Sequence, residues 1–70
     1  MATAVETEDE FDSVFAHMNP ANRQWSVGVS GQGKGSAIVQ GRPGQPYHSV
    51  EAMAKKAFDG QLRISRGLPV

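Results

Sequence analysis

Two glycine-rich stretches constrain this chain more than any other feature. GQGKG occupies residues 31–35, and GRPGQP occupies residues 41–46 with two prolines and two glycines. Glycine and proline favour turns over regular elements, so only short segments fit between these stretches. The flanking segments QWSVGVS (24–30) and SAIVQ (36–40) read as two strands, the first by strict alternation and the second by its β-branched residues. The sequence therefore predicts a hairpin closed by a loose glycine loop.

A helix follows the second glycine-rich stretch. Ser49 is a good N-cap residue, and apolar residues then recur with helical spacing at Val50, Met53, Ala54, Ala57 and Phe58. Gly60 stands where a left-handed C-terminal cap is expected. Beyond it, QLRIS (61–65) alternates again and predicts a third strand.

The N-terminal segment also has helical spacing. Thr7 and Glu10 fit a capping box, and Asn19-Pro20 predicts the end of the element because the residue before proline avoids the helical region. The apolar stripe consists of Phe11, Val14, Phe15 and Met18. This helix either packs on the rest of the domain or docks in the groove of a partner.

Together these elements predict a small α+β domain with the order α-β-β-α-β. We expect a mainly antiparallel three-stranded sheet covered by one helix, with an acidic amphipathic helix in residues 1–20 and a basic β-β-α-β body in residues 21–70. A chain of 70 residues buries only about 60% of its unfolded surface. Without cysteine it has neither disulfides nor thiolate metal sites, so a partner, including a second copy, is the support left open.

Charge is divided unevenly along a chain whose net charge is zero. Residues 1–18 hold five acidic residues and no Lys or Arg, whereas residues 19–70 hold seven basic residues against two acidic ones. This asymmetry predicts an acidic arm joined to a basic body. The N-terminus has neither a basic start nor a long apolar segment, so we expect a cytoplasmic protein without membrane contact.

The stretch GVSGQGKGS (28–36) comes close to the phosphate-binding motif G-x-x-x-x-G-K-[ST]. Gly28, Gly33 and Lys34 match, but Gly35 replaces the hydroxyl residue that binds Mg²⁺. The following residues favour a strand, whereas a phosphate-binding loop must lead into a helix. We therefore expect a hairpin tip with a solvated lysine, or a loop that contacts nucleic-acid phosphates, and we expect neither enzymatic activity nor a cofactor or metal.

Two sets of residues are candidates for macromolecular binding. The first would bind a protein partner through the acidic helix: Phe11, Val14, Phe15, Met18, Glu8, Asp9 and Asp12. The second would contact nucleic-acid phosphates: Lys34, Arg42, Lys55, Lys56, Arg63 and Arg66.

Two segments show partial resemblances to known families. SVEAMAKKAFDG (49–60) resembles the last helix of double-stranded-RNA-binding domains, although its lysine pair comes late in the helix. Residues 25–70 resemble, in order of elements, small phage proteins that inhibit bacterial RNA polymerase. Both resemblances imply a small non-catalytic regulator.

We therefore expect a regulatory or inhibitory protein of phage or plasmid type. Its partner would be a protein in nucleic-acid or transcription machinery, and direct nucleic-acid binding by the basic set is the alternative.

Overall fold

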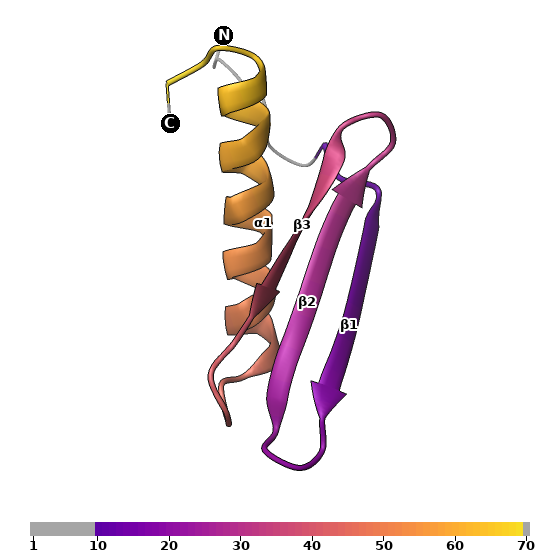
Figure 1. Cartoon of the computed structure of the whole chain (residues 1–70), viewed down its shortest axis with the longest axis vertical. Coiled ribbons are helices and arrows are strands. Elements are labelled where there is room, and N and C mark those ends of the chain that lie inside the picture. Colours follow the sequence, from indigo (N-terminus) through magenta and orange to yellow (C-terminus); the bar gives the residue numbers. More distant parts are fainter. Residues whose placement is uncertain (1–9, 70) are drawn as a thin grey trace, which may run out of the picture.

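A computed structural model describes residues 10–69 of the chain. Three strands precede one long helix: β1 (Ser13–Asn19), β2 (Gln24–Gly31), β3 (Gly35–Gln40) and α1 (Tyr47–Ser65). The strands form an antiparallel sheet in the order β1-β2-β3, so β2 is central and β1 and β3 are its edges (Figure 1). The α+β class and the three-stranded sheet with one helix are confirmed.

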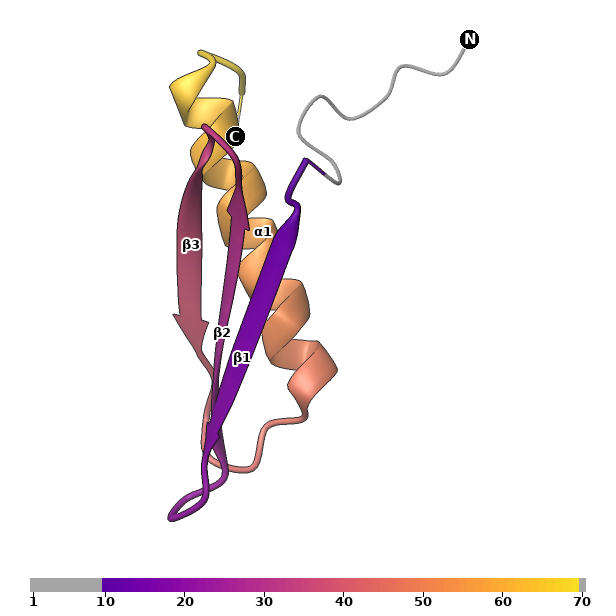
Figure 2. The same cartoon turned by 90° about the vertical axis from the view of Figure 1, so that its right-hand side faces the viewer.

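The helix covers one face of the sheet, as Figure 2 shows. It packs on β2 and β3, and no close backbone approach joins it to β1 among the described residues. The core consists of seven buried residues from β2, β3 and α1: Val27, Val29, Ala37, Val50, Ala54, Phe58 and Leu62. Since side chains alternate along a strand, the even-numbered residues of β2 lie on the opposite face of the sheet.

The sequence-based prediction of an N-terminal helix is wrong where the structure describes the segment. Ser13–Asn19 form β1, which pairs with β2 from Ser13↔Ser30 to Asn19↔Gln24. Residues 1–9, with the predicted Thr7 cap, lie outside the described residues. The apolar residues of the predicted stripe fit a period of 3.6, whereas along a strand they divide between its two faces. Pairing with β2 nevertheless prevails, because a helix this short is marginal in water and leaves its first four N–H and last four C=O groups without intrahelical partners.

The predicted third strand at residues 61–65 is also wrong, because α1 continues to Ser65. Gly60 lies inside the helix and does not cap it. A glycine inside a helix costs about 1 kcal/mol relative to alanine, whereas burying a leucine side chain contributes about 1.5–3 kcal/mol. Leu62, which is buried, extends the stripe of Val50, Ala54 and Phe58 at a spacing of four residues, so continuing the helix is favoured.

The helix ends about two turns beyond the predicted position, with its left-handed glycine at Gly67 and not at Gly60. Gly67 has a positive φ of 73°, and the Leu68 N–H donates to the Arg63 carbonyl over 2.7 Å while the Gly67 N–H donates to Ile64. This pair of bonds is the Schellman arrangement. At the other end Pro46, and not Ser49, precedes the first helical residue, Tyr47. Within residues 10–69, no helix is both long and apolar enough to cross a bilayer.

Candidate protein-binding surface

A row of three residues crosses the centre of the sheet on the face opposite α1. Phe15 of β1 pairs with Gly28 of β2, and Gly28 pairs in turn with Ile38 of β3. Phe15 is 52% exposed and Ile38 is 62% exposed. Solvated faces of antiparallel sheets usually carry polar side chains, so two large apolar residues at the centre of this face require an explanation.

Gly28 allows the Phe15 ring to lie against the sheet. A Cβ atom built on Gly28 would come within 2.1 Å of the tip of that ring, far inside van der Waals contact. Gly28 is itself buried although its face of the sheet is open. The glycine therefore creates a flat apolar platform in which an aromatic ring replaces the missing side chain.

The rest of this face is polar but carries no Asp, Glu, Lys or Arg. We define the open face as the sheet positions whose side chains point away from α1: Ser13, Phe15, His17, Asn19, Gln24, Ser26, Gly28, Ser30, Ser36, Ile38 and Gln40. The formal charge of this set is zero with histidine neutral. An uncharged polar rim around an apolar centre is typical of protein interfaces, whose centres are depleted of charge.

The residues predicted to bind a protein partner do not share one stripe. Phe15 is on the open face, but Val14 and Met18 lie on the side of β1 that faces α1, where they are 37% and 38% exposed. Phe11 precedes β1 and packs partly buried against the core, with the Lys55 ammonium 4.9 Å from its ring centre. Glu8 and Asp9 fall outside the described residues.

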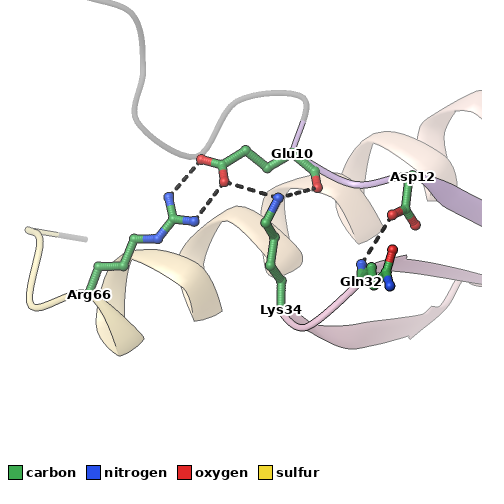
Figure 3. A network of polar contacts seen from close by, with 5 residues as sticks. All are labelled: Glu10, Asp12, Gln32, Lys34 and Arg66. Atoms are coloured by element: carbon green, nitrogen blue, oxygen red, sulfur yellow. Dashed lines mark hydrogen bonds and ion pairs between the residues drawn. The ribbon is translucent and has the colours of Figure 1, made fainter.

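Two acidic residues just before β1 form hydrogen bonds and ion pairs with distant parts of the chain. The Glu10 carboxylate accepts two hydrogen bonds of 2.6 Å from the Arg66 guanidinium and lies 3.4 Å from the Lys34 ammonium (Figure 3). Asp12 accepts a hydrogen bond from the Gln32 backbone N–H. The bond from Arg66, assisted by Lys34, lowers the pKa of Glu10 from its usual 4.5 to about 2. Glu10 thus ties together the start of β1, the β2–β3 turn and the end of α1.

Most of the predicted nucleic-acid set is paired with acidic residues of the same chain. Four of its six members form ion pairs within the chain: Lys34 and Arg66 with Glu10, Lys55 with Glu51 and Arg63 with Asp59. Arg42 lies in the loop before α1, at the opposite end of the helix from Arg66. Internal pairing reduces the positive field that such residues can present to phosphates.

The glycine-rich stretch is a hairpin turn and not a phosphate-binding loop. It joins two antiparallel strands, and Gly33 and Gly35 supply the positive φ values of the turn. Strand β3 follows directly, so the loop does not lead into the N-terminus of a helix as a phosphate-binding loop must. Lys34, expected to be solvated, donates to the Glu10 carbonyl oxygen over 3.4 Å as well as pairing with its carboxylate.

Two aromatic side chains pack against each other where the sheet meets the start of α1. The Trp25 and Tyr47 rings meet edge to face with their centres 5.0 Å apart. Burial raises the pKa of Tyr47. The neighbouring Glu51 carboxylate, which accepts a hydrogen bond from the Tyr47 hydroxyl, raises it further. These rings pack at the margin of the core, where they stabilise the docking of α1.

Comparisons with protein-family models, with curated proteins and with solved structures returned no match. Among residues 10–69, no three side chains of the His, Cys, Asp and Glu types gather as metal ligands.

Sequence reasoning missed Ile38 and Gly28 as members of this candidate surface. One pattern could have identified them: a glycine within a strand that pairs with an aromatic residue on one neighbouring strand and a β-branched residue on the other. That signal becomes readable only once residues 13–19 are assigned to a strand.

Proposed function

We propose that this chain is a small non-catalytic protein that binds a protein partner through its open face. The observation that carries the proposal is the platform of Phe15 and Ile38 across Gly28, exposed at the centre of an uncharged rim. Large apolar side chains surrounded by polar ones are the usual centres of binding energy in protein interfaces. The small size of the chain favours binding over the formation of a concave catalytic site, and a regulatory or inhibitory role is part of this proposal.

The open face favours a protein over a nucleic acid. It contains no Lys or Arg, whereas most affinity for nucleic acids comes from neutralised phosphates. Four of the six candidate basic residues are already paired within the chain. A partner in transcription or nucleic-acid machinery would therefore be contacted through its protein surface.

Affinity capture from the native host tests the proposal with two matched variants. Ile38→Ser removes the apolar group from the open face, and Ile64→Ser removes one of similar exposure (67%) from α1. We expect Ile38→Ser to reduce recovery of the partner by at least about tenfold, as for a residue at the centre of an interface. Ile64→Ser should recover the partner as the unmodified chain does.

Equal recovery by both variants would contradict a role for the open face. Recovery that disappears after nuclease treatment, and that weakens steeply with salt, would instead support direct nucleic-acid binding. In that case Arg42→Gln and Lys56→Gln should lower the affinity while Ile38→Ser leaves it unchanged.

A further inference from the structure

The outer edge of β1 is an exposed template for strand pairing. All seven residues of β1 are exposed, and the segment SVFAHMN contains no charged residue and no proline. Natural edge strands are usually protected by lysines, prolines, bulges or a covering helix. Here α1 packs on β2 and β3 and leaves β1 at the far side of the sheet (Figure 1).

Hydrogen bonding in the sheet determines which backbone groups face this edge. The Gly41 N–H donates to the Trp25 carbonyl over 2.8 Å, so Trp25 directs its backbone groups toward β3. Because the direction alternates along a strand, Ser26 and Gly28 direct theirs toward β1. Their partners His17 and Phe15 are consequently bonded to β2. The intervening residues of β1 direct their N–H and C=O groups outward: Val14, Ala16 and Met18.

These outward residues are complementary to a second copy of themselves. Antiparallel pairing about a two-fold axis at Ala16 places Val14 of one copy opposite Met18 of the other, and the converse. All three outward residues then exchange both backbone hydrogen bonds. The same register uses β1 over its whole length and places Phe15 opposite His17 on the open face.

Side-chain chemistry favours this register. Val14 and Met18 are 37% and 38% exposed on the side of β1 that faces α1, so cross-strand apolar pairs would cover surface that the monomer leaves in water. Antiparallel pairing also brings the acidic start of β1, with Asp12, toward the β1–β2 turn of the other copy. Arg23 is the charged residue of that turn, and such complementary ends favour one register over others.

Pairing through the outer edge of β3 would bury less apolar surface than pairing through β1. The outward residues of β3, whose side chains lie on the open face, are Ser36, Ile38 and Gln40, and two of these are polar. The alternate residues Ala37 and Val39 already pack in or against the core under α1. Pairing through β3 would therefore add hydrogen bonds while covering little further apolar surface.

We propose that two copies of this chain associate through β1 to form a continuous six-stranded sheet with both helices on one side. The two-fold axis is perpendicular to the sheet and passes midway between the Ala16 residues of the two copies. Closed symmetric association of this kind removes the β1 edge from both copies at once. The dimer also joins the two open faces into one surface, so a partner would encounter two Phe15–Ile38 platforms side by side.

Sedimentation equilibrium of the full chain from about 10 μM to about 1 mM tests this inference. We expect a concentration-dependent rise toward twice the 7.5 kDa chain mass. Ala16→Lys would place two ammonium groups together at the axis, and we expect the dissociation constant to rise by at least about tenfold because like charges are costly in an interface. Ile64→Lys, on the exposed side of α1, is the matched control and should associate normally. Circular dichroism verifies that each variant is folded.

Mixing provides a second readout that does not depend on the stability of one variant. Ala16→Glu mixed with Ala16→Lys should restore association, since opposite charges then meet at the axis. A monomer at all concentrations would overturn the inference, as would equal association of Ala16→Lys and the unmodified chain. Loss of association in Ile38→Lys but not in Ala16→Lys would place the contact at β3 and overturn it as well. Partner capture by a strictly monomeric chain would leave the proposed function standing while the β1 dimer fails.

Discussion

Replacing Gly60 by alanine tests whether the helix runs through this position. Gly60 lies within α1 (Tyr47–Ser65), and a Cβ atom built on it meets no atom within 4 Å apart from its chain neighbours and the surrounding helix backbone. No steric cost therefore opposes the gain in helix propensity, which is about 0.8–1.0 kcal/mol for glycine to alanine. Part of this gain comes from the reduced entropy of the unfolded chain.

The expected change in melting temperature follows from the size of the domain. For 60–100 residues, 1 kcal/mol corresponds to about 4–8 °C, so Gly60→Ala should raise Tm by about 3–8 °C. Thermal unfolding followed by circular dichroism at 222 nm measures it. Protein concentration must be the same for each variant, because association would itself raise Tm.

Gly67→Ala is the matched control for this experiment. Gly67 has a φ of 73°, and a left-handed conformation costs an alanine about 1–2 kcal/mol. We expect its Tm to fall by about 4 °C or more. A fall in Tm for Gly60→Ala, similar to that for Gly67→Ala, would refute the reasoning, because it would mean that the helix ends at Gly60 in a left-handed cap and that a strand follows.

Two further predictions concern the ion pairs and the core. Because the pKa of Glu10 is lower in the folded chain (about 2) than its usual 4.5, its stabilising contribution is complete above about pH 4.5 and is lost as the pH falls through about 2. The Tm of the unmodified chain should therefore fall more steeply across this range than that of Glu10→Gln, and parallel curves would contradict the Arg66 contact. Phe58→Ala should cost about 3–5 kcal/mol because the side chain is fully buried, which is similar to the whole stability expected of so small a core. Urea unfolding should find this variant largely unfolded at 25 °C, whereas Ile64→Ala, at an exposed site, should change stability by less than about 0.5 kcal/mol.

Local sequence was sufficient wherever neighbouring residues decide the conformation. The hairpin of residues 24–40 follows from alternation around a glycine turn, and Gly33 and Gly35 adopt the positive φ values that the turn requires. The stripe of Val50, Ala54 and Phe58 predicted the buried side of α1. In both cases the residues that form the element lie close in sequence, so the pattern contains the necessary information.

Long-range pairing decided the elements that the sequence left ambiguous. The apolar spacing of this segment favours a helix, but pairing with β2 makes residues 13–19 a strand. The candidate site followed from this choice: helical spacing would place Phe15 beside Val14 and Met18, whereas the strand puts Phe15 on the open face and the other two on the reverse side.

The sequence by itself determined the α+β class, the central hairpin and the apolar side of the helix, since these depend on turns and periodicity between close neighbours. Only the tertiary structure decided the order of elements, the length of α1 and the position of the exposed platform. The physical reason is that the free energy of strand pairing and of burying Leu62 depends on residues far away in the chain. Such contributions exceed the local preferences of residues such as Gly60, whose cost in a helix is about 1 kcal/mol.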